Sequence, residues 1–194
     1  MGTSRASGGD ERAVQEPRQL WTIGHWTCPR EEFLRPLLDE QIEQLVDVRA
    51  LPGSRRSPQF DADSMQQWLA DAGIDYLHLA ELGGRRRRQE VDPDLNAGWR
   101  NTSFKNYADY TLSPDFHQGL ERLEELATQR RTTIMCGEPM PWRCHRLLIA
   151  NLLTASGWTV WHLRVGAAPH RHEFGKWGAT PVVDDSGRVT YPAH

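Results

Sequence analysis

The sequence predicts an α/β protein: a single-domain three-layer sandwich with a mostly parallel sheet and helices on both faces. Three observations favour this fold class. Short apolar runs typical of buried strands alternate with segments of helical periodicity, about four times along the chain. The chain has 194 residues, of which 38% are hydrophobic, and this suits one domain with a full core. No internal repeat or low-complexity array competes with this interpretation.

The first expected strand covers residues 20–24. Pro29 then opens a helix, since proline suits the first helical turn, and the apolar residues of that helix share one face. These residues are Phe33, Leu37 and Leu38.

The second expected strand covers residues 45–49 and leads into a turn-rich loop over residues 52–58. Asp63 is the expected N-cap of the next helix, which Gly73 ends. Residues 74–79 form the third expected strand.

No regular element is expected between residues 83 and 102, and a loop of that length is usually functional or mobile. A short helix is expected near Phe104 and Tyr107, and Pro114 starts a longer one. The remaining expected elements are a strand at 132–136, a helix at 147–153, a strand at 158–163 and a hairpin of 182–183 with 189–191.

Residues 1–17 are rich in Gly, Ser, Glu and Arg and have no apolar periodicity, so we expect a disordered tail before one domain over residues 18–194. No apolar run approaches the roughly 20 residues of a membrane span, and no secretory signal is visible. Three cysteines in such a chain favour the reducing cytoplasm and argue against disulfides. We therefore expect a cytoplasmic protein without membrane contacts; the sequence leaves its oligomeric state open.

Polar side chains follow the ends of three predicted strands. The carboxyl ends of parallel strands meet at one edge of the sheet, where open α/β sheets place their ligand sites. The residues expected at this edge are His25, then Asp47, Arg49, Ser54 and Arg55, and then Cys136, Glu138, Arg143, Cys144, His145 and Arg146.

Five short motifs occur in order along the chain. They are Thr22-Ile23-Gly24-His25, Asp47-Val48-Arg49 with Pro52 and Ser54-Arg55, Leu82-Gly83-Gly84, Cys136-x-Glu138, and Cys144-His145-Arg146. This pattern resembles a prokaryotic family catalogued as domain of unknown function 488, and it extends from about Trp21 to His162. The resemblance implies the same α/β fold and supplies little established function. One position departs from it, since Trp26 stands where the family usually has Ser.

Two carboxylates are the expected acid/base groups. Asp47 and Glu138 follow apolar strands, and a pair of carboxylates in one cleft can act as general acid and base. Alternatively, each carboxylate pairs with a nearby arginine, Arg49 or Arg146, and only braces the loops. His25 and His145 are candidate proton relays, although such residues are often only hydrogen-bonded structural groups.

Basic residues at the same edge predict an anion clamp, because guanidinium groups match phosphate oxygens bidentately. The expected clamp is Arg49, Arg55, Arg143 and Arg146, and Ser54 is a further candidate for substrate binding. The run Arg85 to Arg88 precedes aromatic residues that include Tyr107, a combination that can hold and stack a nucleic-acid strand. Such a run can equally be a solvated basic loop.

Cys136 is a candidate nucleophile before a helix N-terminus, or a buried thiol with no chemical role. The first arginine after it is Arg143, one residue later than in a C-x5-R phosphatase loop. No metal is expected, because the sequence has no C-x2-C pair and because Cys144 and His145 would diverge by about 100° on a helix. No cofactor motif is present either.

These observations predict a cofactor-independent hydrolase that acts on a phosphate-bearing substrate. The expected partner is a nucleic acid or a phosphorylated small molecule, and the expected bond is N-glycosidic or phosphoester. Two alternatives stay open: a nucleic-acid-binding module without catalysis, and a thiol-based redox or transfer protein that uses Cys136.

Overall fold

A computed structural model describes residues 18–53 and 56–193 of the chain. The tail expected over residues 1–17, and the candidate substrate-binding residues Ser54 and Arg55, lie outside the described residues. Within the described part of the chain, no helix is both long and apolar enough to cross a membrane.

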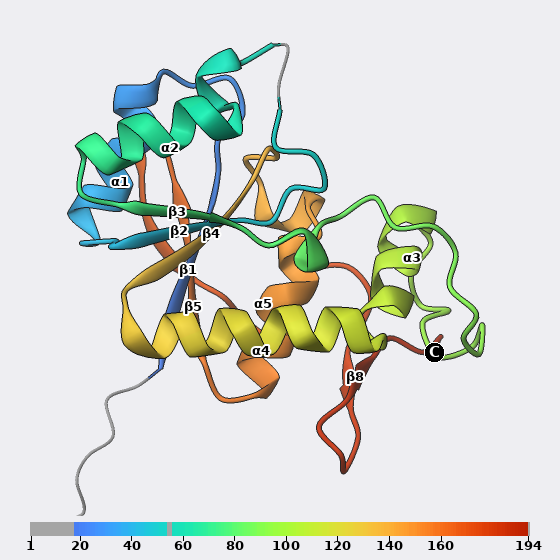
Figure 1. The fold of residues 1–194 in the computed structure, drawn as a ribbon. Coiled ribbons are helices and arrows are strands. Elements are labelled where there is room, and N and C mark those ends of the chain that lie inside the picture. Colours follow the sequence, from blue (N-terminus) through green and yellow to red (C-terminus); the bar gives the residue numbers. More distant parts are fainter. Residues whose placement is uncertain (1–17, 54–55, 194) are drawn as a thin grey trace, which may run out of the picture.

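A six-stranded sheet forms the middle layer, with strand order β3-β2-β4-β1-β5-β6 (Figure 1). All neighbouring strands pair in parallel except β5 and β6, which are antiparallel. A separate hairpin pairs β7 with β8. The strands are β1 (Gln19–Gly24), β2 (Gln44–Asp47), β3 (Asp75–His78), β4 (Thr132–Cys136), β5 (Thr159–Arg164), β6 (Ala167–Arg171), β7 (Val182–Val183) and β8 (Val189–Thr190).

Helices cover both faces of the sheet, which gives the expected three layers (Figure 1). Helices α1 (Arg30–Asp39) and α2 (Ala62–Asp71) lie on one face, and α4 (Pro114–Gln129) and α5 (Arg146–Ala155) lie on the other. Helix α3 (Thr102–Tyr110) lies beside the end of α4. Three short 3₁₀ helices complete the fold: η1 (Pro58–Phe60), η2 (Ala80–Leu82) and η3 (Pro141–Arg143).

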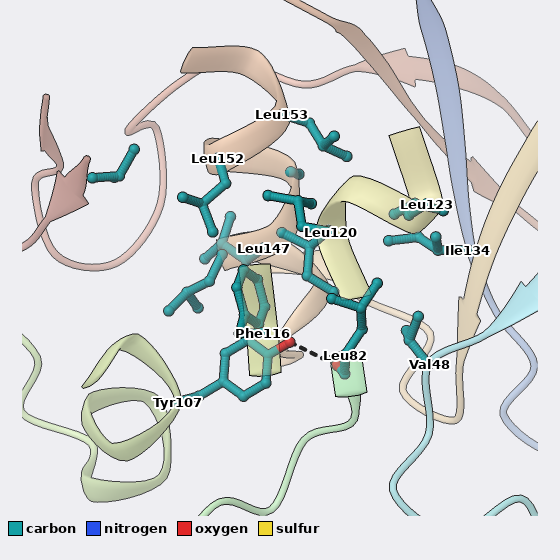
Figure 2. Packing of buried hydrophobic residues seen from close by; sticks show 14 of the residues in the cluster. Val48, Leu82, Tyr107, Phe116, Leu120, Leu123, Ile134, Leu147, Leu152 and Leu153 are labelled. Atoms are coloured by element: carbon teal, nitrogen blue, oxygen red, sulfur yellow. Dashed lines mark hydrogen bonds between the residues drawn. The ribbon is translucent and has the colours of Figure 1, made fainter. Parts of the chain in front are cut away.

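The sheet separates two apolar cores. Successive residues of a strand point to opposite faces, so Leu45 packs with α1 and α2 whereas Val46 packs with α4 and α5. Figure 2 shows part of the larger core, where Phe116 lies beside Tyr107. The Tyr107 hydroxyl donates a hydrogen bond to the carbonyl oxygen of Leu82 at 2.7 Å, and this contact ties α3 to η2.

The predicted fold class is confirmed, but two local expectations are wrong and one strand was not expected. Asp61, not Asp63, is the N-cap residue of α2. Leu38 is 52% exposed, because the buried face of α1 is narrow and consists of Phe33 and Leu37. Strand β6 was not expected, since its mostly exposed residues lack the apolar alternation of a buried strand.

The central strands bring three chain segments to one edge of the sheet. Beyond the regular pairing, the amide of His25 donates to the Cys136 carbonyl at 3.0 Å, and the amide of Val48 donates to the Met135 carbonyl at 2.9 Å. The loops that follow β1, β2 and β4 are therefore held side by side, as the sequence predicted.

Candidate functional site

A cavity of about 500 Å³ opens at this edge of the sheet. The loops after β1, β2 and β4 contribute to its lining, as do the segment after η2 and helix α3. The sequence-predicted residues that line it are His25, Arg49, Tyr107, Cys136, Glu138, Arg143, Cys144 and His145. The predicted convergence of polar side chains is thus present in the structure.

Asp47 lies beneath this cavity and does not line it. Its fully buried carboxylate accepts hydrogen bonds from the Arg49 guanidinium, at 2.6 Å for the closest pair, and from the Tyr76 hydroxyl at 2.8 Å. The Arg49 amide donates to the same carboxylate at 3.0 Å. Asp47 therefore positions Arg49, and its geometry fits the bracing alternative better than the acid/base one.

His25 supports Arg49 from the other side. Its Nδ1 lies 2.6 Å from the Trp26 carbonyl, so Nδ1 carries the proton and Nε2 accepts from Arg49 Nη1 at 3.3 Å. Burial, assisted by the charge on Arg49, lowers the pKa of His25 to about 4. The ring stacks on Phe60 at 4.4 Å. A neutral imidazole whose lone pair already has a donor is a positioning group rather than a proton relay.

Glu138 is the carboxylate that faces the cavity. Its main-chain carbonyl accepts a hydrogen bond from Arg146, whose side chain is fully buried and is absent from the cavity lining. Arg146 also contacts Thr22 Oγ1 and Cys144 Sγ, both at 3.4 Å. Arg146 thus fixes the loop after β4, and the prediction that it binds substrate does not fit this position.

Gly24 permits this arrangement. A Cβ atom at Gly24 would lie 1.9 Å from the Glu138 carbonyl oxygen and 2.8 Å from Arg146 Nη2. The end of β1 and the loop after β4 can approach this closely only where no side chain intervenes.

Two thiols and an imidazole meet at the base of the cavity. His145 Nδ1 lies 3.6 Å from Cys144 Sγ and 3.9 Å from Cys136 Sγ. The expectation that Cys144 and His145 diverge is wrong, because Cys144 follows η3 in an extended conformation, with φ −132° and ψ 150°, and is not helical. Sequence reasoning placed Cys144 on the helix, whereas α5 begins only at Arg146.

The two thiols differ in acidity. The hydrogen bond with Cys144, together with burial, raises the pKa of Cys136 well above its usual value. Burial alone would also raise the pKa of Cys144, but Cys136, His145 and Arg146 together lower it well below its usual value. Cys136, the candidate nucleophile of the sequence analysis, is thus the thiol with the raised pKa, and Cys144, with the lowered pKa, is almost completely buried.

Sequence reasoning missed Ser103, which faces the cavity together with Phe104 and Arg85. Arg85 is the first residue of the arginine run noted in the sequence, and it has a positive φ of 59°. The arginine run is divided, since Arg86 instead donates to the carbonyls of Gly83 and Ala80 and lies over the Tyr110 ring. A glycine pair before the run was the available signal, because such pairs mark chain reversals that can turn a side chain inward.

The fold and site define a three-layer α/β protein with a charged cavity at the carboxyl edge of its parallel strands. Within that class, the chain belongs to the family described as Domain of unknown function DUF488, whose model matches residues 29–153, more than half of the chain. The matched segment includes Asp47, Arg49, Glu138 and the thiol–imidazole cluster, and it begins after His25. No curated protein and no solved structure matches the chain.

Proposed function

We propose that this protein is a hydrolase whose cavity binds a phosphate-bearing substrate, a nucleotide or a nucleic-acid strand. The proposal rests mainly on the charge of the lining. Among the described residues that line the cavity, Glu138 is the only carboxylate, whereas Arg49, Arg85 and Arg143 are cationic. A concave, mostly cationic lining attracts anions and suits phosphate oxygens in particular.

Among these arginines, Arg49 is the one whose side chain is preorganised for anion binding. Asp47 and His25 contact its guanidinium, and Tyr76 holds Asp47 in turn, so little conformational freedom is lost when an anion binds. Arg143 is exposed, and its side chain makes no hydrogen bond or ion pair within the described ranges, so its guanidinium remains available to a ligand. Together they support one rigid and one adaptable phosphate contact.

Glu138 is the proposed acid/base group. A carboxylate beside a bound phosphate ester or nucleoside can take a proton from an attacking water, or give one to the leaving group when protonated. Either step fits hydrolysis of an N-glycosidic or a phosphoester bond. Asp47 has no direct part in the chemistry, because its oxygens are committed to Arg49 and Tyr76.

The test combines turnover and binding. Wild type, Glu138→Gln and Arg143→Ala are incubated with labelled single- and double-stranded DNA and RNA, damaged-base duplexes and a nucleotide panel. The matched controls are Glu121→Gln and Arg122→Ala, which change exposed residues of α4 outside the cavity. We expect product from wild type and both controls, none from Glu138→Gln with retained binding, and weaker binding with Arg143→Ala.

The nature of the product decides which bond is cleaved. Release of a free base indicates the N-glycosidic bond, and strand scission or release of phosphate indicates the phosphoester. Binding that falls steeply with salt, without product from any substrate, would replace the hydrolase with a binding module. Equal turnover by Glu138→Gln and wild type would refute the role of Glu138.

A further inference from the structure

The thiol–imidazole cluster has a geometry that the proposed hydrolytic function does not require. One donor atom from each of Cys136, Cys144 and His145 lies within 4.8 Å of the other two. In a tetrahedral zinc site, bond lengths of about 2.3 Å to sulfur and 2.0 Å to nitrogen place neighbouring ligand atoms about 3.5–3.8 Å apart. The lower value applies to a nitrogen–sulfur pair, and the observed nitrogen–sulfur separations of 3.6 and 3.9 Å exceed it only slightly.

The imidazole is already oriented as a metal ligand. His145 Nε2 lies 2.9 Å from the Val48 carbonyl oxygen, which can only accept, so Nε2 carries the proton. The Nδ1 lone pair is thereby directed at the two sulfurs. Metal-binding histidines usually donate their second ring N–H to a carbonyl or carboxylate in this way, which fixes both tautomer and ring angle.

The surroundings of the cluster supply further support. Arg146 Nε lies 3.4 Å from Cys144 Sγ and can donate to a coordinated thiolate. Tyr107 packs against the His145 ring with a centroid distance of 4.9 Å. The backbone of Gly84 lies so close that a Cβ there would be 2.7 Å from His145 Nδ1. The Cys144 and His145 donors are therefore held by contacts from several elements.

We propose that Cys136, Cys144 and His145 bind one Zn²⁺ ion at the base of the cavity. The two thiols lose their protons to solvent when the ion binds, and the Nδ1 lone pair coordinates without any proton transfer. Three protein ligands leave the fourth tetrahedral position to water or another ligand, and all three residues line the cavity. The inference stands on the ligand geometry and does not depend on the proposed hydrolysis.

The test is a zinc titration of reduced, metal-stripped protein against a chromophoric chelator, with circular dichroism to confirm folding. The variants are Cys136→Ser, Cys144→Ser and His145→Gln. The matched control is Cys28→Ser, since Cys28 lies outside the cluster and its thiol donates to the His25 carbonyl. Wild type and Cys28→Ser should bind one ion per chain. The zinc affinity of each cluster variant should fall by more than about 100-fold. Loss of a group that only hydrogen-bonds to a ligand already lowers metal affinity by about 10–100-fold.

A second measurement uses only the wild-type chain, in case a variant does not fold. The absorption spectrum of the stripped protein with added Co²⁺ should show thiolate-to-metal charge-transfer bands whose intensity corresponds to two thiolate ligands. It should also show the visible bands of a tetrahedral Co²⁺ ion. Zinc should protect Cys136 and Cys144, but not Cys28, from alkylation. The proposal is overturned if the folded, reduced chain binds no stoichiometric metal, if the cluster variants bind as tightly as wild type, or if the two thiols instead form a disulfide that zinc does not prevent.

Discussion

The Arg49 guanidinium is held against the Asp47 carboxylate, with Nε 3.0 Å from both carboxylate oxygens and Nη2 2.6 Å from Oδ2. Both side chains are almost completely buried, and Arg49 also donates to the Phe60 carbonyl at 2.8 Å. An arginine and an aspartate two residues apart on one strand end thus form a rigid unit. Its cationic side reaches the cavity, and its anionic side does not.

Replacing Asp47 by Asn should destabilise the fold strongly. The substitution leaves the buried Arg49 charge without its counter-ion, and breaking a buried pair in this way costs about 3–5 kcal/mol. Urea unfolding of the variant measures the change. The control is Asp75→Asn, which removes an exposed ion pair with Arg130 and should cost less than about 1 kcal/mol. Equal losses of unfolding free energy from the two substitutions would show that the buried Asp47–Arg49 pair stabilises the fold no more than an exposed pair does.

The sequence predicted which residues gather at the site, because the carboxyl ends of neighbouring parallel strands must meet. It could not predict which face of the loop each side chain takes. Asp47 is covered because Tyr76 and Arg49 close over it, and this depends on how β3 pairs with β2. Cys144 joins the cluster because η3 ends one residue before it, and the pattern of apolar residues does not mark such a boundary.

Gly24→Ala should be among the most damaging single substitutions in the chain. Its methyl group would lie 1.9 Å from the Glu138 carbonyl oxygen, so the backbone after β1 or after β4 must move. We expect a loss of at least about 3 kcal/mol of unfolding free energy, or insoluble protein. Gly53→Ala is the matched control, since the nearest heavy atom to its added carbon is 3.8 Å away. Wild-type stability in Gly24→Ala would contradict the close approach of these loops.

The neutral rings of His145 and His25 should be opposite tautomers. His145 donates from Nε2 to Val48, and His25 donates from Nδ1 to Trp26. Long-range ¹H–¹⁵N correlation spectra of metal-stripped protein at pH 8 distinguish the two forms by the shifts of the ring nitrogens. His145→Gln and His25→Gln provide the assignments. A His145 ring protonated at Nδ1 would contradict the orientation on which the proposed zinc site depends, and a His25 ring protonated at Nε2 would contradict the contact with Arg49.

Stability should fall as the pH falls from about 6.5 towards 4, because a buried histidine pair resists protonation. Thr22, His162, His172 and Asn151 form a hydrogen-bonded chain in which His172 Nε2 lies 2.9 Å from Asn151 Oδ1 and His172 Nδ1 lies 3.0 Å from His162 Nε2. Asn151 Oδ1 accepts, so His172 Nδ1 must accept from His162. A proton added at His172 Nδ1 would face the His162 N–H.

Burial lowers the pKa of His172 from 6.5 to about 4, with a further contribution from His170. Between these two values the unfolded chain binds a proton that the folded chain does not, so acidification favours unfolding. For His172 alone the loss should approach about 3 kcal/mol by pH 4. Urea midpoints across this range should therefore change less steeply in His172→Gln than in wild type. The control His117→Gln alters an exposed ring and should keep the wild-type slope of urea midpoint against pH. If His172→Gln also keeps that slope, His172 does not cause the pH dependence.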